Sequence, residues 1–144
     1  LPLRMERHMS NTQILLDYLT SHEQVAWVNH PSLPEHPDHE VAKRLLPKGA
    51  GSIVTFGVKG GRAASQAFIE SVELASHLAN VGDAKTLVVH PGSTTHSHIT
   101  PEAMKAAGLS EDMIRLSVGL EDINDIKADF DQAFKKAARK AGAK

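Results

Sequence analysis

Four short apolar runs are the feature of this sequence that most restricts its fold. Between them lie longer segments in which apolar residues recur every three to four positions, as on one face of a helix. The runs are VAWV, SIVTFGV, TLVVH and MIRLSVG, at residues 25–28, 52–58, 86–90 and 113–119. Strand-length runs that alternate with helical segments are typical of a sheet covered by helices. The sequence therefore predicts a four-stranded sheet.

Helical periodicity fills most of the chain outside these runs. Thr100 and Pro101 supply a capping hydroxyl and a first-turn proline, and Asp122 is the predicted cap of the last helix. The predicted helices cover residues 4–20, 38–46, 62–78, a short segment from 101 to Gly108, and the C-terminal segment after residue 122. We predict an α/β fold, a two-layer sandwich whose mixed or antiparallel sheet has helices on one face.

Composition excludes several functions for a chain of 144 residues, which has the size of a single domain. Sixteen basic and 17 acidic residues give a net charge of −1, so no long-range field draws nucleic acid or an anionic membrane. The absence of cysteine excludes disulfides and Cys-ligated zinc. No apolar run approaches the roughly 20 residues of a membrane helix. We expect neither a nucleic-acid partner nor a membrane partner.

Histidine pairs and a Ser/Thr cluster are weak candidates for chemistry. His36 and His39 lie three residues apart, and His96 and His98 lie two apart. A metal site needs three or four convergent ligands, so we predict no metal. The hydroxyls from Ser93 onward lack a nucleophile-elbow pattern, and no glycine-rich phosphate loop is present.

Arg115 stands in the middle of the last apolar run. Strand alternation places Ile114 on one face with Leu116 and Val118, and Arg115 on the other with Ser117 and Gly119. We expect this second face to be polar and uncrowded. From the pattern alone, Arg115 can lay its stem on the sheet surface, pair with an internal carboxylate, or bind an anion through its planar fork.

Three long segments together resemble the C-terminal domain of the Cys/Met-metabolism enzymes that use pyridoxal phosphate. They are HPDHEVAKRLLPKGAGSIVTFGVKGG, NVGDAKTLVVHPGSTTHSHIT and IRLSVGLEDINDI, in this order. The similarity runs from about residue 3 to the end, and within the family it is greatest to the O-acetylhomoserine sulfhydrylase branch. It implies the fold-type I architecture of aspartate aminotransferase, in which a large domain holds the cofactor.

The resemblance also implies how this chain is organised. Residues 1–144 would be the small C-terminal substrate-binding domain, with residues 1–24 as an inter-domain helix. The large cofactor domain would precede Leu1, because no lysine here has the Ser/Thr-rich context of the family's Schiff-base lysine. Pyridoxal 5'-phosphate would be bound there, so we predict no catalytic or cofactor-binding residue in this chain, and no activity for it alone.

Two residues would hold the substrate's α-carboxylate if the resemblance extends to the site. The arginine of the family's IRLSVGLED motif is Arg115 here, and the polar residue in the turn before the third strand is Asn80. Ser93 and Thr95, in the STTH segment, are candidate lining residues of the active site.

The implied reaction is γ-replacement: O-acetylhomoserine and sulfide give homocysteine and acetate. Cystathionine γ-synthesis and β- or γ-elimination by the same family remain alternatives, as does a non-catalytic module that binds a small carboxylate. The resemblance further implies an amino-acid substrate, a homotetramer and a cytoplasmic location.

Overall fold

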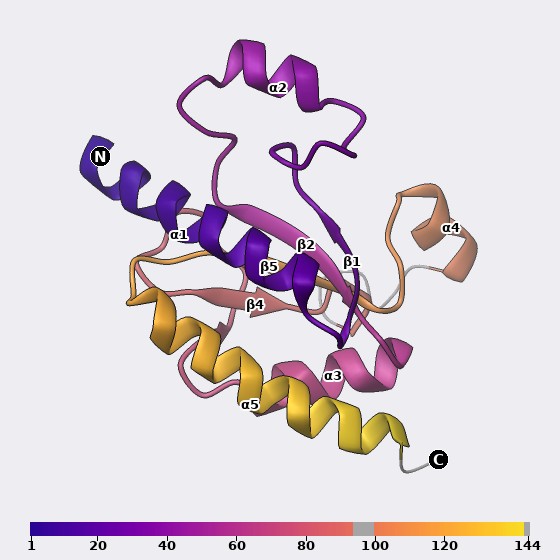
Figure 1. Cartoon of the computed structure of the whole chain (residues 1–144). Coiled ribbons are helices and arrows are strands. Elements are labelled where there is room, and N and C mark those ends of the chain that lie inside the picture. The colour runs from indigo at the N-terminus through magenta and orange to yellow at the C-terminus, as the bar shows by residue number, and fades with distance from the viewer. Residues whose placement is uncertain (94–99, 143–144) are drawn as a thin grey trace.

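The computed structural model describes residues 1–93 and 100–142. Its centre is a five-stranded sheet with the strand order β1-β2-β5-β4-β3 (Figure 1). The strands are β1 (Val25–Asn29), β2 (Ile53–Val58), β3 (Ser76–His77), β4 (Leu87–Val89) and β5 (Met113–Ser117). Only β3 and β4 run parallel, while the other neighbours are antiparallel. The sheet is therefore mixed, one of the two arrangements that the sequence predicted.

Three longer helices and two short ones complete the fold. They are α1 (Pro2–Ser21), α2 (His39–Leu45), α3 (Gly61–Ser71), α4 (Pro101–Ala106) and α5 (Ile123–Gly142), with a 3-10 turn η1 (Pro91–Ser93). Both predicted caps are present: the Thr100 hydroxyl accepts from the Ala103 N–H, and the Asp122 carboxylate accepts from the Asn124 N–H. In Figure 1, α2 stands away from the body on its own loop, and none of its residues is buried.

The prediction of four strands was wrong, because the predicted helix 62–78 is in fact two elements. Helix α3 ends at Ser71, Val72 is extended (φ −65°, ψ 141°), and the fifth strand β3 follows. Leu78, the last residue of the predicted helix, is 55 % exposed. The cause is a long-range contact. The buried carboxylate of Asp129 on α5 accepts hydrogen bonds from the three consecutive backbone N–H groups of residues 73–75.

One apolar core lies between the sheet and helices α1, α3 and α5. Phe56 of β2 makes edge contacts with Phe68 of α3 and Phe134 of α5, and Phe130 packs on Phe68. Leu15, Leu16 and Leu19 of α1 belong to the same cluster of buried side chains. A single core on one side of the sheet gives the predicted two-layer sandwich, and it leaves the opposite face for other contacts.

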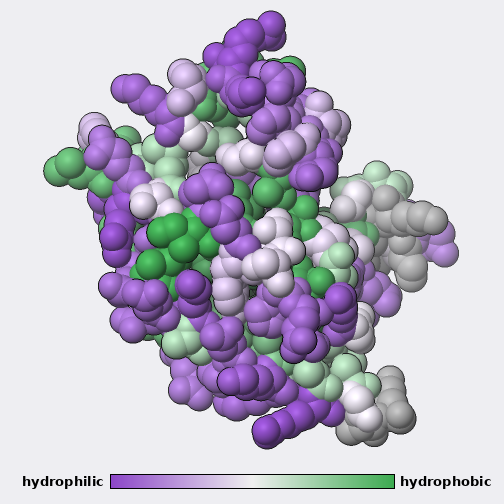
Figure 2. Space-filling view, viewed as in Figure 1, coloured by the Kyte–Doolittle hydropathy of each residue, from purple (hydrophilic) through white to green (hydrophobic). Residues whose placement is uncertain are grey.

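The outer surface is mainly polar in the view of Figure 2, with apolar side chains gathered in small patches. Within the described residues, no helix is both long and apolar enough to cross a membrane.

Candidate functional site

Arg115 lies in β5, which is flanked by β2 and β4. Its Cα is opposite Thr55 on one side and Val89 on the other. Ile114 and Leu116 are fully buried in the core, so Arg115 projects from the opposite face, as strand alternation predicted. The arginine is half-buried. A permanent positive charge is therefore held by two neighbouring strands rather than by a loop.

The guanidinium of Arg115 has no hydrogen-bond acceptor or ion-pair partner among the residues that the structure describes. Arg4 and Arg7, by contrast, donate to backbone carbonyls. A half-buried cation that lacks an internal carboxylate has its full set of donors available to an external anion. Of the readings left open by the sequence, pairing with an internal carboxylate finds no support in the described part of the chain.

The face around Arg115 is more crowded than expected. Ser117 is 3 % exposed, and Leu87 and Val89 of β4, which share this face by register, are buried as well. Gly119 is also buried, and a Cβ on it would collide with the Glu121 carboxylate. The expectation of a polar and uncrowded face is therefore wrong at its Ser117 end, where residues 85–86, just before β4, lie against Gly119.

Asn80 lies in the exposed turn between β3 and β4. Its Nδ2 donates to the Asp83 carboxylate over 3.3 Å, and its Oδ1 accepts from the Val81 N–H. The Lys85 N–H lowers the pKa of Asp83 most. Desolvation opposes this shift, and the Asn80 amide and the charges of Arg4 and Lys85 add smaller lowering effects. Asp83 thus stays ionised and orients one of the two Asn80 N–H groups. No hydrogen bond joins Asn80 to Arg115 in the described structure.

The other candidate lining residues fall at or beyond the limit of the description. Ser93 ends the η1 turn, and Thr95 lies outside the described residues, as do His96 and His98. Just before this segment, the buried ring of His90 donates from Nε2 to the Glu111 carbonyl over 2.7 Å. The chain thus enters the STTH segment from a fixed point.

The lysines whose side chains are described do not suit the Schiff base of a pyridoxal phosphate site. A Schiff-base lysine must lose its proton, which requires shielding from water or a neighbouring cation. Every lysine whose side chain is described is exposed except Lys127, and its Nζ lies 5.7 Å above the Tyr18 ring. None of these described lysines has the shielded environment that a Schiff base requires, and binding of the cofactor outside this chain stays a prediction.

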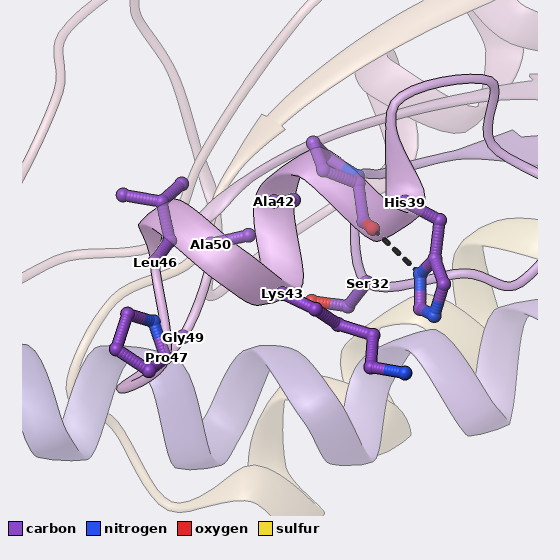
Figure 3. A pocket seen from close by; sticks show the side chains of 9 residues that line it. Ser32, His39, Ala42, Lys43, Leu46, Pro47, Gly49 and Ala50 are labelled. Carbon is purple, nitrogen blue, oxygen red and sulfur yellow. Dashed lines mark hydrogen bonds between the residues drawn. The ribbon is translucent and has the colours of Figure 1, made fainter.

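The histidines near α2 are engaged locally. His36 Nδ1 accepts from the Asp38 N–H, and His39 donates from Nδ1 to the Pro31 carbonyl over 3.0 Å. Both residues of the latter bond line a hollow of about 340 Å³ beside α2, and so does Lys43, whose side chain points outward (Figure 3). No group of three or more His, Asp or Glu side chains with metal-binding geometry occurs in the described residues.

Sequence reasoning missed a polar cluster on α1. His8 and Asn11 are each 1 % exposed, yet their hydrogen-bond partners lie at the end of β5, three and more residues past Arg115. The signal that could have found them is the helical spacing of Arg4, Arg7, His8 and Asn11 at i, i+3, i+4 and i+7.

Similar proteins are enzymes of sulfur amino-acid metabolism. Over 134 residues the chain is 51 % identical to O-acetyl-L-homoserine sulfhydrylase 1 of Thermus thermophilus, which covers 93 % of this chain and 32 % of that protein. It is 49 % identical over 137 residues to homocysteine synthase of Schizosaccharomyces pombe, and this match covers 95 % of this chain and 32 % of that protein. The chain spans about a third of the length of the curated relatives that it matches.

A solved structure shares the fold. Cystathionine gamma synthase of Xanthomonas oryzae pv. oryzae, in complex with cystathionine, superposes with a TM-score of 0.89 at 33 % identity, over 96 % of this chain and 36 % of that one. This likeness confirms the predicted fold class, that of the fold-type I enzymes. A family model described as Cys/Met metabolism PLP-dependent enzyme matches residues 1–135. The chain therefore belongs to the Cys/Met-metabolism family of pyridoxal-phosphate-dependent enzymes.

Proposed function

We propose that this chain is the substrate-binding part of an O-acetylhomoserine sulfhydrylase. The full-length protein would convert O-acetylhomoserine and sulfide into homocysteine and acetate by pyridoxal-phosphate-dependent γ-replacement. The names of the relatives at 49 to 51 % identity support this assignment over that of the 33 % identical cystathionine gamma synthase. The cofactor and its lysine would lie in the part of the protein outside residues 1–144.

The single observation that carries the role of this chain is the unpaired guanidinium of Arg115. It is half-buried, it is fixed between β2 and β4, and no described group accepts its protons. Its planar fork matches a carboxylate with two parallel hydrogen bonds. We assign it to the α-carboxylate of the amino-acid substrate. A substrate held at this end has its Cα fixed in direction, which contributes to rate through orientation.

Asn80 is assigned to the same carboxylate. Its amide has two N–H groups, of which Asp83 takes one. The second is available to a substrate oxygen, and the ionised Asp83 sets the plane of the amide. We keep Ser93 and Thr95 as candidate lining residues, and the homotetramer and the cytoplasmic location as predictions.

Cystathionine synthesis is the second candidate function, because the structural neighbour bound to cystathionine covers 96 % of this chain. Both reactions use an activated homoserine and differ in the thiol that replaces its acyl group. Assaying the full-length protein with O-acetylhomoserine and either sulfide or cysteine separates the two. We expect homocysteine from sulfide at a rate well above that of cystathionine from cysteine, and the opposite preference would overturn the assignment.

Arg115→Ala in the full-length protein tests the role of this chain. Lost charged hydrogen bonds of about 1.5–3 kcal/mol correspond to a fall in kcat/KM of about 10- to 150-fold for the amino-acid substrate. Arg62→Ala is the matched control, because Arg62 is an exposed arginine on α3. An unchanged kcat/KM in Arg115→Ala would overturn the assignment of Arg115 to the substrate carboxylate.

A further inference from the structure

Four polar residues on one face of α1 donate hydrogen bonds to backbone carbonyls far away in the sequence. We call them the α1 polar stripe: Arg4, Arg7, His8 and Asn11. His8 Nδ1 donates to the Val118 carbonyl over 2.6 Å, and Asn11 Nδ2 lies 3.0 Å from the carbonyls of both Gly119 and Glu121. Arg4, at the start of the stripe, contacts a second segment: it donates to the Gly82 carbonyl over 2.8 Å.

The stripe therefore contacts both segments that carry the proposed carboxylate ligands. Val118 comes three residues after Arg115, and Gly82 comes two residues after Asn80. Arg7 adds contacts to the Leu120 and Glu121 carbonyls at 3.4 and 3.2 Å. One helix thus sets the position of a strand end and of a turn that lie 36 residues apart (118 − 82).

The two segments are also bonded to each other. The Glu121 carboxylate accepts from the Thr86 N–H at 2.6 Å and from the Thr86 hydroxyl at 2.8 Å. The Thr86 Oγ1 in turn accepts from the Gly119 N–H, and the Leu120 N–H donates to the Ala84 carbonyl. Together with the α1 polar stripe, these bonds close a network around the start of β4 and the end of β5.

Three polar side chains of this network are buried. His8, Asn11 and Thr86 are at most 1 % exposed, although apolar side chains at such positions avoid the cost of burying polar groups. Polar groups that are buried and paired fix a unique geometry, because a shifted partner would leave them unsatisfied. The ring of His8 also keeps its Nε2 buried with no partner among the described residues.

We propose that His8 and Asn11 are positioning residues that set the distance between Asn80 and Arg115, and so the fit of the substrate carboxylate. This inference rests on the proposed function of those two ligands. A displacement of about 1 Å at a binding group is enough to lower reaction rates about 100-fold. A network that fixes the segments of Asn80 and Arg115 can therefore affect how the substrate carboxylate is bound without contacting the substrate.

The test measures selectivity for the carboxylate rather than total activity. The holoprotein is titrated with L-methionine and with L-methioninamide. Both share the four-carbon amino-acid skeleton of the homoserine part of the proposed substrate, and the second has a carboxamide in place of the carboxylate. The readout is the ratio of their dissociation constants, Kd(amide)/Kd(acid). General loosening of the protein weakens both ligands alike and leaves this ratio unchanged, whereas a misplaced carboxylate grip lowers it.

His8→Phe keeps the ring and removes the donor, and we expect it to lower the ratio about tenfold. His8→Asn should restore the ratio to within about twofold of wild type, because an Asn amide places a donor at the same bond distance from Cα as Nδ1. Gln13→Ala, on the exposed face of the same helix, is the matched control and should leave the ratio unchanged. Arg7→Met removes only an exposed side chain and should lower it about threefold.

The outcomes separate this inference from the proposed function. A wild-type ratio near one, or an unchanged ratio in Arg115→Ala, overturns the carboxylate grip and with it the positioning role. A ratio that collapses in Arg115→Ala but stays at the wild-type value in His8→Phe overturns the positioning role alone. If His8→Phe does not fold, an unchanged ratio in Asn11→Leu, which removes the other buried donor at similar side-chain volume, overturns it instead.

Discussion

The hydroxyl of Tyr18 on α1 donates a 2.6 Å hydrogen bond to the carboxylate of Asp131 on α5. It joins the first long helix to the last, 113 residues apart. Partial burial of the phenol raises the pKa of Tyr18 well above its usual value near 10, and the hydrogen bond and negative charge of Asp131 raise it further. Folding therefore stabilises the neutral phenol of Tyr18 relative to its phenolate.

An alkaline titration of the 144-residue chain checks this, since Tyr18 is its single tyrosine. We expect no rise of tyrosinate absorbance near 295 nm around pH 10 while the helical circular dichroism persists. A raised folded pKa means that stability is fully present below about pH 10 and is lost as the pH rises beyond it. Asp131→Asn should bring ionisation to lower pH. Ionisation of the wild-type chain at pH 10 with its helices intact would contradict the finding.

Acid should destabilise the chain through His30. Burial of the ring lowers the pKa of His30, with a backbone contact at Gly51 opposing the shift and the charge of His36 adding to it. Because the lowered value belongs to the folded state, the unfolded chain takes up the proton first. The free energy of unfolding should fall as the pH drops below about 6.5. Urea unfolding between about pH 7 and pH 5 measures this slope.

His30→Asn should flatten the slope without removing the local contact. The Nδ1 of His30 accepts from the Ser32 N–H, and an Asn oxygen can accept the same N–H. His77→Asn is the control, because His77 is an exposed histidine in β3. A slope that stays the same in His30→Asn would show that other groups, such as His22 with its similarly lowered pKa, carry the dependence.

Asp129 should be among the most sensitive positions for stability. Its carboxylate accepts from the N–H groups of Glu73, Leu74 and Ala75 at 2.7 to 3.0 Å, and it is 7 % exposed. Asp129→Ala leaves these donors without a partner, and we expect a loss of about 3 kcal/mol in the free energy of unfolding. The exposed Asp125→Ala on the same helix should cost at most about 1 kcal/mol. Equal losses in chemical denaturation would contradict the proposed role.

Gly119→Ala should strain the contact between the start of β4 and the end of β5. An added Cβ would meet the Glu121 carboxylate and the Thr86 backbone nitrogen at distances that real side chains do not adopt. We expect about 1–3 kcal/mol of destabilisation, as in other overpacked sites. Gly142→Ala meets nothing within 4 Å and should be neutral or slightly stabilising. Thermal unfolding of both variants decides the point.

The sequence predicts what local periodicity encodes. The four longer strands, the caps at Thr100 and Asp122, and the outward direction of Arg115 follow from residues within one element. The end of α3 and the two-residue strand β3 do not, because Asp129, more than 50 residues away, takes the N–H groups that would otherwise continue the helix. The residues next to α3 in the sequence do not indicate that Asp129 will accept these hydrogen bonds.

The proposed carboxylate ligands could be predicted from the sequence, whereas the residues that position them could not. The resemblance draws attention to Arg115 and Asn80 because they sit in recognisable motifs. His8 and Asn11 have partners 108 to 110 residues away, and those partners are backbone carbonyls, which no sequence pattern marks. Only the folded chain brings them together.

Contacts of α1 to carbonyls have one more consequence. A carbonyl is present at every residue whatever its side chain. The hydrogen bonds from α1 therefore depend on the backbone position of residues 82 and 118–121 and not on the side chains there. Leu120 could be exchanged for another residue without removing an acceptor, whereas a one-residue insertion in 118–121 would shift every acceptor out of register. Leu120 should therefore tolerate substitution, whereas segment 118–121 should reject changes in length.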